Sequence, residues 1–361
     1  MSKKIFALLL LIILKTTTNA QEQAIASIVD SFASKESFNG VVLIAEKGKP
    51  IYKKVIGYRT FENKAPLKED DIFELASVSK QFTAMVIMML QERGKLQFDD
   101  SINQYVSVPY AGITIRHLLT HTSGLPDYQA IMDQYWDKSK VAGNEDIIAY
   151  LHKYHPPSLF APGEKYNYSN TGYVLLASIA EKASGIDFIQ FCNTEIFKKL
   201  GMKSTAIRTL AEKAAVKNFA IGHMYVPERS QFIRADSFPS SNYTIWLGNR
   251  KGPGRISSTA EDLLKWDQAL YTEKLVKQIT LAEAFSSATL NNGKESSYGF
   301  GWDISSDKDG NKIVSHNGDN PGYKTQIVRF LNSRRTLIVL CNNAIPSFSK
   351  MIAGLEDVMN N

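Results

Sequence analysis

The sequence predicts an α+β fold in which helices flank an antiparallel sheet built from both ends of the chain. Runs rich in Val, Ile and Leu, typical of strands, lie near the two ends, at residues 40–59 and 300–340. Residues 80–200 between them carry apolar residues at helical spacing and little strand pattern. Strands that are grouped apart from the helices, rather than alternating with them, indicate an α+β protein.

The length and composition are those of a folded protein with a substantial core. The chain has 361 residues, of which 44% are hydrophobic and 22% are charged, enough for one large or two intergrown domains. We predict a sheet domain formed by residues 21–79 and 240–361, with a mainly helical domain inserted between them at residues 80–239. The formal net charge of +6 is modest. No nucleic-acid-binding motif accompanies it, so no nucleic-acid partner is expected.

Residues 1–20 predict a secretory signal peptide. Lys3 and Lys4 precede an apolar stretch at residues 5–14, and Ala20 ends the polar segment that follows. The apolar stretch is shorter than the ~20 residues that a membrane span needs, so no stable membrane span is expected after cleavage. An uncleaved anchor is the alternative. We therefore predict an exported bacterial protein, periplasmic or secreted.

The remaining elements follow from apolar spacing and from the Gly, Pro and capping residues that bound them. Predicted helices cover residues 23–34, 77–90, 114–126, 145–152, 171–184, 187–200, 257–270 and 347–359. Predicted strands cover residues 40–46, 51–59, 219–225, 300–304, 312–316, 325–331 and 335–340, and residues 227–254 are expected to be irregular. Cys192 and Cys341 lie in apolar segments and are expected to be buried free thiols. No Cys and His cluster has metal-ligand spacing, so no metal site is predicted.

The most informative stretch joins Ser77 to Lys80 at the start of an apolar helix. A helix turns once per ~3.6 residues, so both side chains lie on one face with the amine within reach of the hydroxyl. The unpaired amides at a helix start stabilise negative charge on a nucleophilic oxygen. Residues 82–90 are apolar nearly all round, so we expect a buried helix that holds the pair rigidly. The same spacing recurs at Ser305 and Ser347, but neither precedes a buried helix.

A second candidate, Tyr168 with Asn170, lies in a loop before a helix. In an extended loop, residues two apart point the same way, so both side chains can face Ser77. Beside a cationic amine the pKa of the phenol is expected to fall from ~10, which would make Tyr168 a usable base. Taken alone, a loop Tyr of this kind more often serves packing.

The third candidate is His316 with Gly318, at the end of a predicted strand. The strand edge offers a free amide as a donor to an oxyanion. Gly318 removes a side chain where a substrate backbone would approach. A lone His on a strand is more often structural, so the argument depends on the three motifs occurring together and in this order.

That ordered set resembles the serine beta-lactamase and penicillin-binding protein superfamily, in the group of class C beta-lactamases, D-Ala-D-Ala carboxypeptidases, D-aminopeptidases and related esterases. The likeness extends from about Asn39 to Asn343. Further matching segments are His117 to Gly124, Tyr168 to Tyr173, Ile256 to Leu263 and Tyr298 to Trp302. The resemblance implies a beta-lactamase/transpeptidase-like fold and a hydrolase that works through an acyl-enzyme without a cofactor.

The resemblance also implies a role for each motif residue. Ser77 would be the acylated nucleophile, and Lys80 would lower the pKa of Ser77 or of Tyr168. Whether Lys80 or Tyr168 is the acylation base stays open. Tyr168 would transfer a proton to the leaving group, and Asn170 would contact Lys80 and a substrate amide. His316 would take the place of the family's third-motif Lys. The amides of Ser77 and Asp319 would form the oxyanion hole.

Two departures from the family pattern bear on the substrate. Class C beta-lactamases usually carry Lys-Thr-Gly where this chain has His316-Asn317-Gly318, and the family often has Gly where Asp319 stands. Asp319 near the oxyanion amide is expected to repel a substrate carboxylate. We therefore expect slow hydrolysis of a peptide or ester ahead of efficient beta-lactamase activity. The candidate substrates are a small amide, a D-amino-acid peptide, a beta-lactam or an ester, and the alternative function is non-catalytic binding of cell-wall fragments.

Overall fold

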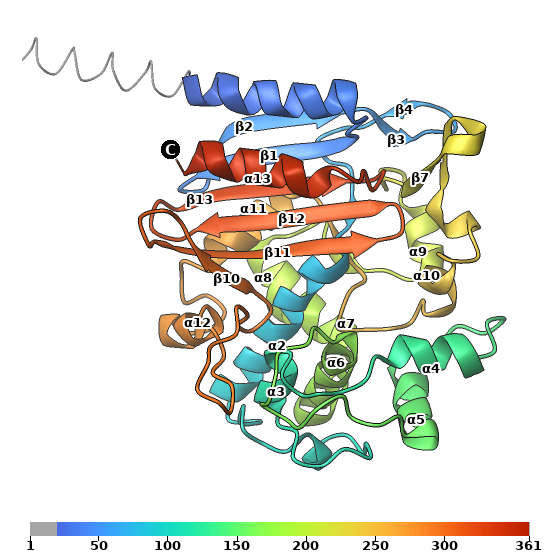
Figure 1. Cartoon of the computed structure of the whole chain (residues 1–361), viewed down its shortest axis with the longest axis vertical. Coiled ribbons are helices and arrows are strands. Elements are labelled where there is room, and N and C mark those ends of the chain that lie inside the picture. The colour runs from blue at the N-terminus through green and yellow to red at the C-terminus, as the bar shows by residue number, and fades with distance from the viewer. Residues whose placement is uncertain (1–19, 361) are drawn as a thin grey trace, which may run out of the picture.

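A six-stranded antiparallel sheet joins the two ends of the chain (Figure 1). The computed structural model describes residues 20–360. The strand order across the sheet is β10-β11-β12-β13-β1-β2, with β1 paired to β13 from the opposite end of the chain. These strands are β1 (Gly40–Glu46), β2 (Lys49–Ile56), β10 (Asp303–Ser306), β11 (Lys312–Asn320), β12 (Tyr323–Phe330) and β13 (Arg335–Cys341). The predicted α+β architecture with a sheet from both chain ends is confirmed.

Three small sheets connect the large sheet to the rest of the molecule. Their strands are β3 (Tyr58–Thr60) with β4 (Ala65–Pro66), β5 (Phe73–Glu74) with β9 (Ile256–Ser258) and β6 (Ala206–Ile207), and β7 (His223–Val226) with β8 (Gln231–Arg234). β5 ends directly before the predicted Ser77 motif, so its pairing with β9 fixes where that motif begins.

Helices cover both faces of the large sheet. One face packs on the helix at residues 20–35 and on α13 (Phe348–Met359), and the other packs on α2 (Lys80–Glu92) and α11 (Ala260–Ala269). Side chains of a strand alternate between faces, so Val42 and Ile44 join the first cluster while Val41 and Leu43 join the second.

The other helices lie in the lower half of Figure 1 and around the sheet edge. They are α3 (Ile115–Leu119), α4 (Tyr128–Tyr135), α5 (Asn144–Tyr154), α6 (Asn170–Ser184), α7 (Phe188–Phe191), α8 (Lys198–Leu200), α9 (Leu210–Ala215), α10 (Tyr243–Trp246) and α12 (Gln278–Ala284). A π-helical turn, η3 (Cys192–Phe197), makes α7 and α8 one continuous helical segment. Short 3-10 turns are η1 (Ala76–Ser79), η2 (Ile102–Gln104), η4 (Pro227–Arg229) and η5 (Ala235–Ser237).

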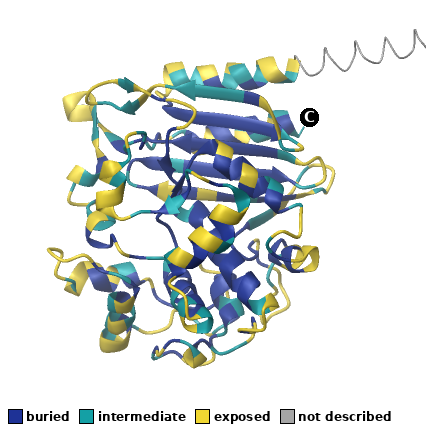
Figure 2. Ribbon diagram, turned by 180° about the vertical axis from the view of Figure 1, so that it is seen from behind, coloured by how far each residue is buried: buried dark blue, intermediate teal, exposed yellow. Residues whose placement is uncertain are grey.

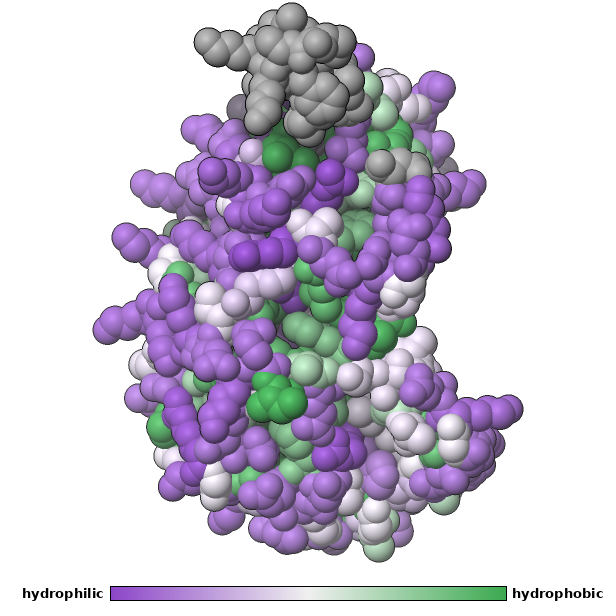
Figure 3. All heavy atoms as spheres, turned by 90° about the vertical axis from the view of Figure 1, so that its left-hand side faces the viewer, coloured by the Kyte–Doolittle hydropathy of each residue, from purple (hydrophilic) through white to green (hydrophobic). Residues whose placement is uncertain are grey.

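The helix that follows the Ser77 motif is central to the molecule. Every residue of α2 from Lys80 to Leu90 is buried, and Figure 2 shows the central sheet strands and this helix as the darkest part of the molecule. The outer surface differs in character: Figure 3 shows one face covered mainly by hydrophilic residues, with hydrophobic ones gathered around its middle. The predicted burial of the helix is therefore confirmed.

Some boundaries differ from the sequence prediction for identifiable reasons. The helix expected from Ser257 begins at Ala260, because residues 256–258 pair as β9 and the Thr259 side chain accepts the cap hydrogen bond from Asp262 N–H. The segment 227–254, expected to be irregular, contains β8 and α10.

Three further predictions concern the chain end, the membrane and the cysteines. The predicted signal peptide falls on residues 1–19, outside the described residues, apart from Ala20. Within residues 20–360 no helix combines the length and apolar character needed to cross a bilayer. Cys192 and Cys341 are free and buried, as predicted.

A buried ion pair ties the sheet to α11 and gives a test of the fold. Arg329 Nε donates to Asp267 Oδ1 at 2.6 Å, and both side chains are fully buried. Replacing Asp267 with Ala leaves a buried guanidinium without its carboxylate, so we expect a loss of about 3–5 kcal/mol in the free energy of unfolding. Urea unfolding followed by circular dichroism measures it.

The matched control is the exposed ion pair between Arg116 and Glu283. Glu283→Ala is expected to cost about 0–1 kcal/mol, because solvent screens exposed pairs. Equal losses in the two variants would contradict the structural role given to the buried pair.

Candidate active site

Ser77 lies in the 3-10 turn η1, one turn before α2, rather than in the first turn of the α-helix itself. The residue before it, Ala76, has φ +48°, in the left-handed region that favours glycine. Non-glycine residues in this region are strained and are retained where the surrounding structure holds them. The Ser77 hydroxyl is therefore presented by a sharply turned segment of backbone.

Two strands hold this turn in place. Leu75 N–H donates to Ile256 O at 2.9 Å, and Ile256 N–H donates to Ser79 Oγ at 3.1 Å. From the large sheet, Thr325 Oγ1 donates to Leu75 O at 2.8 Å. The turn is fixed on both sides of Ser77, which is the preorganisation that a nucleophile needs.

Lys80 is fully buried, and its amine meets three oxygens, one from the neighbouring Ser77 and two from distant segments. Nζ lies 3.0 Å from Ser77 Oγ, 2.9 Å from Asn170 Oδ1 and 2.9 Å from Pro253 O. Burial, reinforced by the charge of Arg250, lowers the pKa of Lys80 well below its usual value. A neutral amine has two N–H groups and one lone pair, so the two carbonyl oxygens accept its N–H groups and the lone pair faces the Ser77 hydroxyl.

The structure brings Tyr168 to the same place. Lys80 Nζ lies 4.7 Å from the centre of its ring. The predicted fall in the phenol pKa is wrong: the groups packed around the hydroxyl desolvate it and raise the pKa of Tyr168, although 39% of the residue's surface is exposed, and the hydrogen bond with Ser77 only partly offsets that rise. The reason is that desolvation disfavours the phenolate, while the neighbouring amine is itself pushed toward its neutral form. Tyr168 is a neutral hydroxyl beside Ser77.

The Tyr168–Asn170 segment is held by His121, a residue that the sequence motifs did not single out. His121 Nδ1 accepts from Ser169 N–H at 3.1 Å, and His121 O accepts from Asn167 N–H at 2.9 Å. Its ring packs on that of Tyr168 with centroids 4.3 Å apart. His121 has φ +58° and is buried, a combination of strain and burial that only coordinates reveal.

His316 lies close to this group as a neutral ring. Its Nε2 is 2.8 Å from Tyr298 Oη, its Nδ1 is 2.6 Å from Asn317 O, and its ring centre is 6.1 Å from that of Tyr168. Burial and the nearby Lys80 lower the pKa of His316 to about 3. His316 therefore cannot supply the positive charge of a third-motif Lys at neutral pH, although its side chain occupies that end of the site.

Gly318 and Asp319 have other surroundings than the sequence suggested. A Cβ on Gly318 would meet Leu75 O at 2.2 Å, so the missing side chain lets β11 approach the Ser77 turn rather than a substrate. The Asp319 carboxylate is exposed and forms an ion pair with Lys324, its cross-strand neighbour. The ion pair with Lys324 and the alternation of its side chain away from Gly318 weaken the expected repulsion of a substrate carboxylate by Asp319, which stays a prediction.

The backbone of β11 next to Ser77 has a free edge. β10 pairs only with residues 312–315, so residues 316–320 continue beyond their neighbour on that side. Within residues 20–360 no group of three or more His, Cys, Asp and Glu side chains is arranged to hold a metal ion. The chemistry available is thus a hydroxyl, an amine, a phenol and main-chain amides.

Known proteins share this organisation over most of the chain. Penicillin-binding protein 4* of Bacillus subtilis (strain 168) is 41% identical over 319 residues, which covers 88% of this chain and 70% of that protein. Protein flp of Staphylococcus aureus (strain MW2) is 26% identical over 349 residues, or 94% of this chain and 66% of that protein. The chain spans about two thirds of the length of these two relatives.

Solved structures share the fold. The octameric penicillin-binding protein homologue from Pyrococcus abyssi matches with a TM-score of 0.77 at 27% identity, over 91% of this chain and 75% of that one. A D-amino acid amidase from Ochrobactrum anthropi SV3 matches with a TM-score of 0.76 at 23% identity, over 95% and 99%. A family model described as Beta-lactamase matches residues 25–355. With the fold, the Ser77 motif and these matches in agreement, the chain belongs to the beta-lactamase family of serine hydrolases and penicillin-binding proteins.

Proposed function

We propose that this protein is a serine hydrolase in which Ser77 forms an acyl-enzyme with a small amide, peptide or ester. The observation that carries the proposal is the amine of Lys80, buried and 3.0 Å from Ser77 Oγ. A buried lysine with a lowered pKa is costly to keep unless it has a chemical task. Its two carbonyl neighbours, on Asn170 and Pro253, orient the lone pair toward the hydroxyl.

Lys80 is the acylation base in this proposal. The lone pair of Nζ takes the Ser77 proton as Oγ attacks the substrate carbonyl. Tyr168, kept neutral by its raised pKa and bonded to Ser77, passes a proton to the leaving group. The amides of Ser77, in the 3-10 turn before α2, and of Asp319, on the free edge of β11, stabilise the oxyanion.

The substrate class is proposed from the family and from the site. A penicillin-binding protein is the relative at 41% identity, which favours D-amino-acid peptides and related amides or esters, and a small molecule of cell-wall origin. The ion pair of Asp319 with Lys324 weakens one argument against beta-lactams, while the neutral His316 in place of a third-motif Lys still favours slow hydrolysis of a peptide or ester. Export through the leader at residues 1–20 would place the enzyme where such substrates occur.

The first test asks whether Ser77 is the nucleophile. Incubation with a fluorescent fluorophosphonate or penicillin, followed by mass spectrometry, is expected to add one label to Ser77. Ser77→Ala should abolish both label and turnover of a nitrophenyl ester, because no other group takes the acyl chain. Ser305→Ala, which alters the same Ser-x-x-Lys spacing at an exposed position of β10, is the control and should keep both.

Absence of any adduct on folded wild-type protein would contradict acyl-enzyme chemistry. Muropeptide binding that survives Ser77→Ala, with no turnover of any ester, would instead support the non-catalytic binder.

The second test concerns the protonation state of Lys80. Because burial lowers its pKa, the amine loses its proton at a lower pH than an exposed lysine and becomes protonated as the pH falls through that lowered pKa. The rate of Ser77 labelling is therefore expected to be level above that pKa and to decline as the pH falls through it, at a lower pH than for an exposed lysine. Lys80→Arg keeps donors but cannot release a proton in this range, so kcat/KM should fall by about 100-fold or more. An Arg variant with near wild-type activity would exclude Lys80 as the base.

The third test separates positioning from folding at His121. His121→Leu removes the acceptor for Ser169 N–H, so the Tyr168 segment is expected to shift and kcat to fall by about 10- to 100-fold with little change in KM. His121→Asn offers an oxygen acceptor and tolerates the left-handed backbone, so it should recover much of the loss. Equal thermal unfolding of the two variants with unequal kcat would support positioning. Equal kcat would contradict it.

A further inference from the structure

A cavity of about 300 Å³ is lined in part by Glu74, which lies close in sequence to the Ser77 turn. Glu74 on β5 and Asn320 at the end of β11 form its inner wall, and Asn320 Nδ2 lies 3.3 Å from Glu74 Oε2. Glu74 is three residues before Ser77, so their Cα atoms are at most ~10 Å apart. The floor is apolar and includes Phe219, Ile221 and Ile245.

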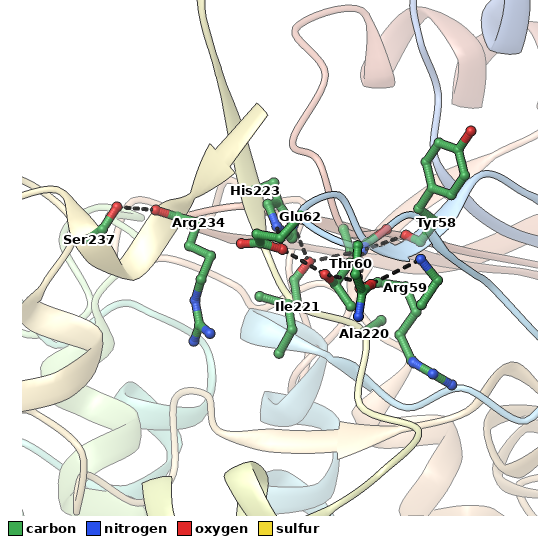
Figure 4. A network of polar contacts seen from close by, with 12 residues as sticks. Tyr58, Arg59, Thr60, Glu62, Ala220, Ile221, His223, Arg234 and Ser237 are labelled. Carbon is green, nitrogen blue, oxygen red and sulfur yellow. Dashed lines mark hydrogen bonds and ion pairs between the residues drawn. The ribbon is translucent and has the colours of Figure 1, made fainter. Parts of the chain in front are cut away.

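The outer wall is a rigid hairpin rather than a loose loop. β7 and β8 are anchored through His223, whose Nε2 is 3.0 Å from Glu62 Oε2 and whose Nδ1 is 2.7 Å from Ile221 O. Figure 4 shows this network, with the Arg234 side chain extending away from it. Arg234 lines the cavity and pairs with Asp236 at 3.0 Å.

The charges around the cavity do not balance. Lys213 is nearly buried in its wall and pairs with Glu74. Near Lys213 lie Arg250 and Arg255, 7% and 3% exposed; burial and these two guanidinium groups lower the pKa of Lys213, whereas its ion pair with Glu74 favours the charged form. In the cavity lining itself Lys213 and Arg234 are matched by Glu74 and Asp236, so the excess positive charge is that of Arg250 and Arg255, which lie outside the lining.

Neither buried guanidinium has an acidic partner among residues 20–360. Arg250 donates to Tyr128 Oη. Arg255 donates to Thr244 O and to Arg208 O, and both of these distances are 3.0 Å. The Nε of both arginines is buried without any partner. Buried cations of this kind favour an anionic group close by.

The backbone conformation of Arg255 indicates that its side chain is needed at this position. Its φ is +83°, a conformation that favours glycine and strains a residue with a Cβ. A strained arginine is retained at such a position where the contacts of its side chain offset the strain. The Thr244 carbonyl that accepts from Arg255 belongs to a residue of the cavity wall, so the guanidinium charge is applied next to the cavity.

A substrate has a direct route from Ser77 to this cavity. The free edge of β11 runs from His316, beside Tyr168, to Asn320 in the cavity wall. These four residue steps span ~13 Å. An extended chain that pairs with this edge would bring its scissile carbonyl to Ser77 and its distal substituent to Lys213 and Arg234.

We propose that this cavity is a subsite for a carboxylate carried by the acyl part of the substrate. The inference rests on the proposed function of Ser77 and adds the charge of the substrate group that is recognised. The cavity walls place Lys213 and Arg234 at the carboxylate, and Arg250 and Arg255 supply a fixed positive field behind them. The apolar floor accommodates the aliphatic segment that joins the carboxylate to the scissile bond.

The test compares two esters that differ only in charge. One is the mono-4-nitrophenyl ester of suberic acid, with a free terminal carboxylate, and the other is the same ester of suberic acid monoamide. Wild-type protein is expected to prefer the carboxylate by about tenfold or more in kcat/KM, mainly through KM, which corresponds to about 1.4 kcal/mol. The preference should weaken at high salt.

Substitutions in the cavity wall show which residues cause the preference for the carboxylate ester. Lys213→Gln and Arg234→Gln should each reduce the ratio toward one, because each removes one cation of the proposed subsite and the ratio cancels any equal effect on the two esters. Arg234 is half exposed, so this variant stays informative if loss of the buried Lys213 impairs folding. Lys324→Gln removes an equal charge that is paired to Asp319 on the opposite side of β11, and it should keep the wild-type ratio.

A second measurement separates this inference from the proposed function. The matching 4-nitroanilides, titrated by calorimetry into the Ser77→Ala protein, should show tighter binding of the carboxylate form whether or not turnover occurs. Equal affinities for the two anilides, or a carboxylate preference that Lys213→Gln and Arg234→Gln leave intact, would overturn the subsite. Loss of Ser77 labelling with the binding preference intact would overturn the hydrolase proposal alone.

Discussion

The desolvated amine of Lys80 is the constraint on which the site depends. A charged ammonium at this depth would be costly, and burial shifts the group toward its neutral form. Two carbonyl oxygens, on Asn170 and Pro253, then consume both of its N–H groups. The only remaining polar neighbour with a proton to share is the Ser77 hydroxyl. The reactivity of the pair thus follows from a hydrogen-bond balance inside a dry core.

Close approaches of backbone create that dry core around the start of α2. A Cβ on Gly318 would collide with Leu75 O, and one on Gly301, at φ +79°, would lie 3.0 Å from Lys80 O. The absence of side chains at these two positions lets β11 and the 298–302 turn pack against the Ser77 turn and the first turn of α2. The strain at Ala76, with φ +48°, is offset by this packing, because the turn has no room to relax.

The sequence is sufficient for the parts of this arrangement that are local. Helical spacing joins Ser77 to Lys80, and the alternation of apolar residues identifies the strands at both chain ends. The sequence could not predict contacts between distant segments, because Pro253, Arg250 and His121 reach the site only through tertiary packing. The sequence did not predict the charge states either, for the same reason. Desolvation in the folded site raises the pKa of Tyr168, and Asp319 forms an ion pair with Lys324 on the neighbouring strand.

The buried arginines connect the reactive amine to substrate charge. Arg250 lowers the pKa of Lys80 as well as that of Lys213, so one guanidinium acts on both the base and the cavity wall. An anion in the cavity would offset part of this positive field. The pKa of Lys80 would then rise, and an amine with a higher pKa is a stronger acceptor for the Ser77 proton while it remains neutral. If the cavity is the proposed subsite, its occupation would therefore be electrostatically coupled to activation of Ser77 by Lys80.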